Sequence, residues 1–91
     1  MVIGILTLEL YIAEANSLKS KRYILRSIKD RLKKFNVSVS EEATDLWQKS
    51  TLVIACVTNE VSHLYSTFEK IKTLILKIPE VEIIKEEMEL F

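Results

Sequence analysis

The chain has 91 residues, with 13 Lys and Arg balanced by 13 Asp and Glu, and only one Cys, one Gly, one Pro and one His. This length predicts one small domain, residues 1–91, that can fold without disulfides or metal. The single Cys excludes a Cys-based metal site, and the single Gly excludes a glycine-rich phosphate loop. A lone His also argues against a Ser-His-Asp triad. We therefore expect no enzymatic activity, no cofactor, no metal and no small-molecule substrate.

The hydropathy pattern indicates a cytoplasmic protein. No apolar run reaches the 18 or more residues of a membrane span, so we expect no membrane partner. No basic segment precedes the first apolar run, as it would in a signal peptide. A single Cys also fits a reducing compartment.

Residues 2–12 predict a first strand, because apolar residues alternate with others from Leu6 onward. The faces hold Val2, Gly4, Leu6, Leu8, Leu10 and Ile12 on one side and Ile3, Ile5, Thr7, Glu9 and Tyr11 on the other. We expect the first face to pack on the core. Gly4 in a strand interior indicates close packing of another element.

Residues 17–35 predict an amphipathic helix that carries 8 of the 13 basic residues. Ser17 is the expected N-cap, with Asn16 as the alternative. The apolar stripe consists of Ile24, Leu25, Ile28, Leu32 and Phe35. Lys21 projects into this stripe. Its stem could cover the edge of the core, or its ammonium could pair with Asp45 or Glu14.

A basic ridge follows this helix on the side expected to face away from the core. It consists of Lys19, Arg22, Arg26, Lys29 and Lys33, with Lys21 and Lys34 at its margins. Such a row could lie along a phosphate backbone, which attracts Lys and Arg without base specificity. The alternative is a solvated outer face.

Residues 36–40 predict a second strand with Val37 and Val39 pointing inward. Residues 41–49 predict a loop, with a frayed strand at its start as the alternative. Residues 51–58 form a nearly continuous apolar run, which indicates a central strand. That strand has either both faces covered, or one covered face and one unusually apolar face.

Asn59 is the expected N-cap of a second helix that ends before Pro79. Its stripe consists of Val61, Leu64, Phe68, Ile71, Ile75 and Ile78. Residues 81–91 predict the last strand. On both faces of this strand the pattern of apolar and charged residues changes midway, which indicates a bulge or a register change near Ile84 and Lys85.

The predicted order is β-α-β-β-α-β. Right-handed crossovers then favour an α+β, ferredoxin-like fold, with an antiparallel four-stranded sheet of order 4-1-3-2 and both helices on one face. The most apolar strands, the first and third, would be central.

Four segments resemble the YlxP-like family of small bacterial proteins of unknown function: MVIGILTLELYI, SLKSKR, RLKKFNVSVSE and DLWQKSTL. The resemblance implies a ferredoxin-like fold. Genes of the family often neighbour those of transcription-elongation and translation-initiation factors, which implies an association with RNA or ribosomes. Between residues 41 and 45 the chain departs from the family pattern, which is usually one residue longer and often contains His or Gln.

The uncovered face of the sheet offers a competing hypothesis. Ile3 and Ile5 would form an apolar patch with residues of the third strand, and Trp47 is added to this candidate interaction surface. In the two central strands, residues 6–8 and 52–57 lack the aromatic residues on which other ferredoxin-like proteins stack RNA bases, and Tyr11 is alone at a strand end. We therefore expect an RNA- or ribosome-associated binding module that uses the basic ridge. The alternative is a protein-interaction module, a homodimer through its sheet face.

Overall fold

The computed structural model describes residues 1–13, 16–42 and 46–91. Six elements follow one another in the predicted order: β1 (Val2–Ile12), α1 (Leu18–Leu32), β2 (Val37–Glu42), β3 (Lys49–Thr58), α2 (Val61–Leu76) and β4 (Val81–Leu90). The described part of the chain forms one elongated unit, with principal-axis extents of 42 × 21 × 19 Å. Neither of its helices is long and apolar enough to cross a membrane.

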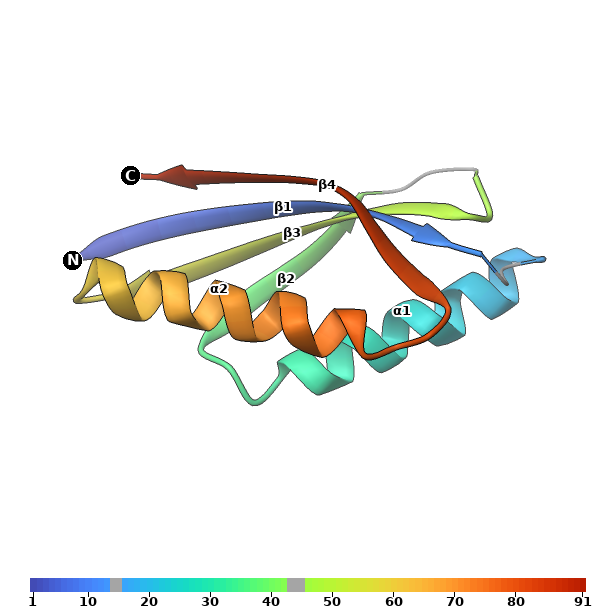
Figure 1. The fold of residues 1–91 in the computed structure, drawn as a ribbon, viewed down its shortest axis with the longest axis horizontal. Helices are drawn as coiled ribbons and strands as arrows, with labels where there is room; N and C mark the ends of the chain where they lie inside the picture. Colours follow the sequence, from blue (N-terminus) through green and yellow to red (C-terminus); the bar gives the residue numbers. More distant parts are fainter. Residues whose placement is uncertain (14–15, 43–45) are drawn as a thin grey trace.

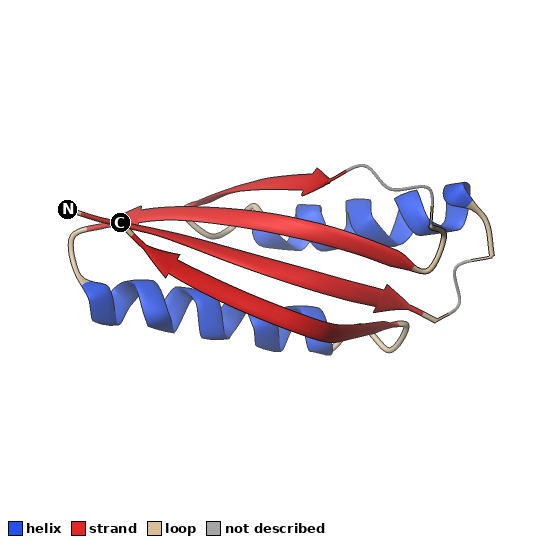
Figure 2. Ribbon diagram, turned by 90° about the horizontal axis from the view of Figure 1, so that it is seen from above, coloured by secondary structure: helices blue, strands red, loops and turns tan. Residues whose placement is uncertain are grey.

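The four strands form one sheet of order β2-β3-β1-β4, in which all neighbours are antiparallel. This is the predicted order 4-1-3-2, counted from the other edge. Both helices cover the same face of the sheet, with α1 on the side of β2 and α2 on the side of β4 (Figures 1 and 2). The ferredoxin-like prediction is confirmed.

The core lies between the helices and this one face of the sheet. Its buried residues on the predicted apolar faces are Leu6, Leu8, Leu10, Ile12, Leu25, Ile28, Leu32, Leu52, Ile54, Leu64, Phe68, Ile71, Ile75 and Ile78. Val61, predicted as part of the α2 stripe, is 42% exposed, so that prediction is wrong. A Cβ atom on Gly4 would stand 2.5 Å from Cδ2 of Leu64. Gly4 therefore permits the close packing of α2 on β1 that the sequence indicated.

The two helices begin differently. The hydroxyl of Ser17 accepts a hydrogen bond from the backbone N–H of Ser20 (3.2 Å), which confirms Ser17 as the N-cap of α1. The predicted cap of α2, Asn59, is wrong. The first backbone hydrogen bond of α2 runs from Leu64 to the carbonyl of Glu60 (3.2 Å), so the cap position falls on Glu60.

The loop predicted at residues 41–49 is shorter than expected. Glu41 and Glu42 continue β2 and stand opposite Leu52 and Thr51, and β3 already begins at Lys49. Backbone pairing with the long third strand outweighs the low strand propensity of two adjacent acids. Residues 43–45 of this loop lie outside the described residues.

The predicted bulge in β4 is confirmed. Glu9 stands opposite Lys85 and Leu10 stands opposite Ile83, so Ile84 has no partner in β1. This extra residue keeps Val81 and Ile83 toward the core and then resets the alternation. Beyond the bulge, Glu86 lies on the helix-covered face and reaches α2.

The other face of the sheet carries no helix (Figures 1 and 2). On β3, Val53 and Ala55 are half-buried and Val57 is exposed, whereas Leu52 and Ile54 on the covered face are fully buried. Of the two alternatives for this strand, the structure has one covered face and one unusually apolar open face.

Candidate functional site

The helix α1 brings three cations of the basic ridge to the surface as predicted. Lys19, Arg22 and Arg26 are exposed. Within the described residues, none of them has an ion-pair partner. No carboxylate of residues 1–13, 16–42 and 46–91 therefore neutralises their charge.

The other two ridge residues have carboxylate partners. Lys29 pairs with Glu41 of β2 (2.7 Å), and Lys33 pairs with Asp30 one turn earlier (3.2 Å). The contact with Glu41 shows that the ridge runs along the flank of α1 next to the edge strand β2, rather than directly away from the sheet. Partly exposed ion pairs of this kind contribute about 0–1 kcal/mol to stability.

Lys21 does not belong to the exposed basic surface, although it was included in the predicted site. Its residue exposure is only 5%, and its ammonium donates a hydrogen bond to the carbonyl of Leu46 (2.7 Å). This bond ties the first turn of α1 to the segment before β3. The two carboxylates considered as partners, Glu14 and Asp45, lie outside the described residues.

An exposed aromatic residue accompanies the ridge and was missed by the sequence reasoning. Tyr23 is 75% exposed. It lines a shallow depression of about 430 Å³ together with Arg26, Ser27, Asp30 and Arg31. The sequence could have indicated this exposure, because Tyr23 lies off the apolar stripe of the helix and directly follows Arg22 of the basic ridge.

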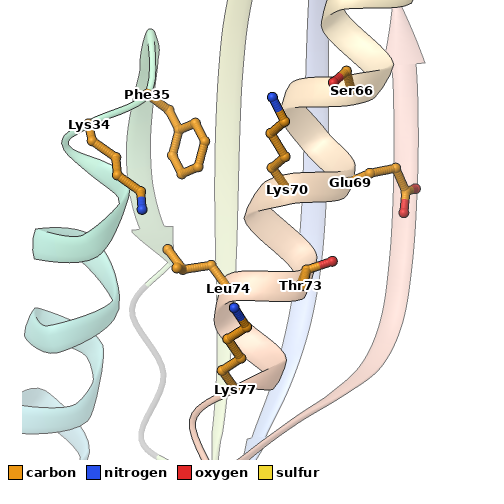
Figure 3. A pocket seen from close by; sticks show the side chains of 8 residues that line it. All are labelled: Lys34, Phe35, Ser66, Glu69, Lys70, Thr73, Leu74 and Lys77. Carbon is orange, nitrogen blue, oxygen red and sulfur yellow. The ribbon is translucent and has the colours of Figure 1, made fainter.

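A second basic region lies in a groove between the end of α1 and α2. The groove has a volume of about 460 Å³ and is lined by Lys34, Phe35, Ser66, Glu69, Lys70, Thr73, Leu74 and Lys77. Lys34 and Phe35 face Lys70, Leu74 and Lys77 across it, and the carboxylate of Glu69 points to the far side of α2 (Figure 3). Of these residues, the predicted site contained only Lys34.

The position of Glu69 has an electrostatic cause. Lys72 pairs with Glu69 (2.7 Å) and with Glu86 of β4 (2.9 Å), and hydrogen bonds to these two carboxylates raise the pKa of Lys72 above its ordinary value. Glu69 is therefore engaged outside the groove. Within the described residues, Lys34, Lys70 and Lys77 have no carboxylate partner. The ammonium of Lys34 lies 5.5 Å from the centroid of the Phe35 ring.

The candidate interaction surface is only partly brought together. Ile3 and Ile5 stand opposite Val57 and Ala55 on the open face of the sheet. Phe91 extends this patch, because two backbone hydrogen bonds (3.5 and 2.8 Å) place it directly opposite Ile3. Trp47 is half-exposed but lies before the start of β3, at the opposite end of that strand. Its grouping with Ile3 and Ile5 is wrong, because the register separates them.

The one Cys and the one His lie in different surroundings. Cys56 is buried, and burial raises the pKa of its thiol, which opposes formation of a nucleophilic thiolate. His63 is exposed on α2. In the ranges that the structure describes, no three His, Cys, Asp or Glu residues gather into a group that could hold a metal ion.

Two similar solved structures share the fold. A de novo designed protein, Foldit4, matches with a TM-score of 0.59 over 100% of this chain and 97% of its own, at 14% sequence identity. Protein SO0527 from Shewanella oneidensis matches with a TM-score of 0.52 over 97% and 88%, at 12% identity. At these identities the likeness supports the architecture alone.

The sequence comparisons define the family. The chain is 36% identical over 83 residues to the uncharacterized protein YlxP of Bacillus subtilis (strain 168), covering 89% of this chain and 90% of that protein. Residues 3–88 match the family model DUF503, described as a protein of unknown function. The resemblance seen in the four sequence segments is confirmed, and the chain belongs to the DUF503 family, which includes YlxP.

Proposed function

We propose that the protein is an RNA- or ribosome-associated binding module, rather than an enzyme, and that it binds through the outer surface of its helices. The observation that carries the proposal is the exposed charge of Lys19, Arg22 and Arg26 on one flank of α1, which no carboxylate in the described part of the chain neutralises. Closely spaced cations attract phosphate groups, and their binding releases counterions from the nucleic acid, which makes the binding free energy more favourable.

The neighbouring aromatic residue makes single-stranded RNA the favoured partner. Tyr23 is exposed beside Arg26. An exposed ring offers a stacking surface to an unpaired base, worth about 1–3 kcal/mol per base in proteins that bind single strands. Backbone contacts from the cations and stacking on one ring together predict binding with little sequence preference.

The proposal is tested by the affinity for a mixed-sequence single-stranded RNA oligonucleotide at low salt. We expect the charge-reversal variant Arg22→Glu/Arg26→Glu to lose at least about tenfold in affinity, because repulsion replaces two phosphate contacts. Its thermal unfolding midpoint should change little, since both side chains are exposed.

The matched control is Lys49→Glu/Lys85→Glu. Both lysines are exposed and lie on the open face of the sheet, opposite Tyr11 and Glu9, and the control changes the net charge by the same amount. It should retain most of the affinity. Equal losses in the two variants, or no binding by the unaltered protein, would reject the proposal. Affinity purification from native cells with and without nuclease then separates RNA-held partners from protein-held ones.

A second candidate function is protein interaction, as a homodimer through the open sheet face. It is favoured by the apolar patch of Ile3, Ile5, Ala55, Val57 and Phe91, in which Val57 and Phe91 are 46% and 66% exposed. Exposed apolar patches often mark interfaces. On this hypothesis Ile5→Glu converts a dimer to a monomer in light scattering. A monomeric unaltered protein at high concentration would exclude it.

A further inference from the structure

We infer that the groove between α1 and α2 is a phosphate-binding site, in which Lys34, Lys70 and Lys77 hold the phosphate group of a nucleotide unit. The inference rests on the proposed function for the assignment of that phosphate to an RNA backbone. It adds a second helix to the binding surface.

The fold creates the groove from two distant parts of the chain. Lys34 and Phe35 follow the end of α1. Lys70 and Leu74 lie on α2, and Lys77 is the C-cap residue directly after it, in right-handed helical conformation. Their spacing of four and three residues places the three side chains on one flank of the helix. Because the helices lie on the same face of the sheet, the two sets meet across a concave space of about 460 Å³ (Figure 3).

Within the described ranges, no carboxylate pairs with the three groove lysines. Four other lysines of the chain, Lys29, Lys33, Lys72 and Lys85, each have a carboxylate within 3.2 Å. The three groove lysines have none among the described residues, and the one acid of the lining, Glu69, is held by Lys72 on the other side of the helix. Three ammonium groups around one concavity match a phosphate group, which accepts charge-assisted hydrogen bonds on several oxygens.

The lining also suits the organic part of a nucleotide. Phe35 and Leu74 are half-buried and pack against the core, so they form an apolar wall between the lysines. Apolar surroundings lower the local dielectric constant and strengthen the attraction between ammonium and phosphate. The hydroxyl-bearing Ser66 completes the polar rim.

The phosphate could come from an RNA backbone or from a free nucleotide, and the experiment separates these sources. The variant is Lys70→Ala/Lys77→Ala, because neither lysine belongs to the basic ridge. The control is Lys49→Ala/Lys85→Ala, which removes the same charge from the open sheet face. Circular dichroism verifies that both variants are folded.

Two measurements are made on each protein. The first is the affinity for a mixed-sequence single-stranded RNA oligonucleotide as a function of salt. We expect Lys70→Ala/Lys77→Ala to weaken binding roughly tenfold at low salt and to lower the log–log salt slope by about 0.7, the value for one phosphate on a single strand. The second is an amide chemical-shift titration with AMP and with inorganic phosphate. Shifts should centre on Phe35 and Leu74 and disappear in the groove variant.

Each outcome separates this inference from the proposed function. If the groove variant binds RNA as tightly as the control does, but AMP shifts the amide signals of Phe35 and Leu74 in the unaltered protein, the site takes free nucleotides. If the variant binds RNA like the control and neither AMP nor phosphate perturbs the groove, the inference is overturned, while a loss in Arg22→Glu/Arg26→Glu would still support RNA binding. If the unaltered protein binds no RNA but AMP perturbs the groove, only the proposed function fails.

Discussion

The segment around α1 and the strand β4 carry charge of opposite sign, and they differ in how much of it is paired within the chain. In β4, Glu86 pairs with Lys72 of α2 and Glu87 pairs with Lys85. On α1, Lys19, Arg22, Arg26 and Arg31 have no carboxylate partner among the described residues. The acidic segment is thus partly neutralised by its own protein, whereas the basic segment largely is not.

This difference separates the charges that form ion pairs between elements of the fold from those that form none among the described residues. The contacts of Lys72 with Glu69 and Glu86 connect α2 to the edge strand. Charged side chains along β4 also discourage edge-to-edge pairing with another sheet. The free cations of α1 have no such structural role, and this is the physical basis for assigning the binding surface to α1.

The largest expected effect concerns Lys21, the cation of α1 whose side chain is buried. Lys21→Ala removes a buried four-carbon stem and the hydrogen bond to Leu46, so we expect a loss of about 2–3 kcal/mol in the free energy of unfolding. The control Lys19→Ala, two residues earlier and exposed, should cost less than about 0.5 kcal/mol. Denaturant unfolding measures both. Equal losses would remove the distinction between structural and free cations on this helix.

An intermediate effect is expected at the contact between α2 and β4. Lys72→Met keeps an apolar stem but removes both ion pairs, and we expect a loss of about 1 kcal/mol at neutral pH. The control is Lys70→Met on the same helix, where no ion pair is lost and stability should hardly change.

The ion pairs of Lys72 with Glu69 and Glu86 also predict that the stability of the protein depends on pH. Because its carboxylate partners raise the pKa of Lys72 above the ordinary value of 10.5, its contribution is complete below that pH and is lost as the pH rises through the folded-state pKa. The difference in stability between the unaltered protein and Lys72→Met should therefore shrink in strongly alkaline solution. A difference that stays constant there would contradict an ion-pair origin.

The smallest effect is expected for Glu41, the acid of β2 that pairs with Lys29 of the basic ridge. Glu41→Gln releases Lys29 from its ion pair and removes a negative charge beside the ridge. We expect a loss of about 0.5 kcal/mol in stability and roughly a twofold gain in RNA affinity. The control is Glu82→Ser on β4, which should not raise the affinity for RNA. A decrease in affinity on Glu41→Gln would show that Glu41 positions Lys29 for binding.

Much of the fold could be predicted because local pattern and topology agree. Alternation in β1, the stripe of α1, the stripe of α2 apart from the exposed Val61, the cap at Ser17 and the irregularity at Ile84 all appear in the structure. The predicted N-cap of α2 was wrong by one residue. The loop before β3 was predicted too long, since the pairing of Glu41 and Glu42 depends on the neighbouring strand.

The candidate site was less accessible to sequence reasoning because it depends on distances between elements. The row Lys19, Arg22 and Arg26 follows from helical spacing alone. The meeting of Lys34 with Lys70 and Lys77, the bond of Lys21 to a backbone carbonyl and the pairing of Lys29 with Glu41 all join residues remote in the chain. Trp47 was misplaced for the same reason, because only the strand register shows which end of the sheet it occupies.

The most direct test of the central claim is the salt dependence of the affinity for single-stranded RNA. For three to five phosphate contacts we expect a log–log slope of about −2 to −4 in the unaltered protein. Arg22→Ala/Arg26→Ala should reduce its magnitude by about 1.4, the value for two phosphates, and Lys49→Ala/Lys85→Ala should leave it unchanged. An affinity independent of salt, or the same slope in both variants, would contradict the assignment of the free cations of α1 to RNA.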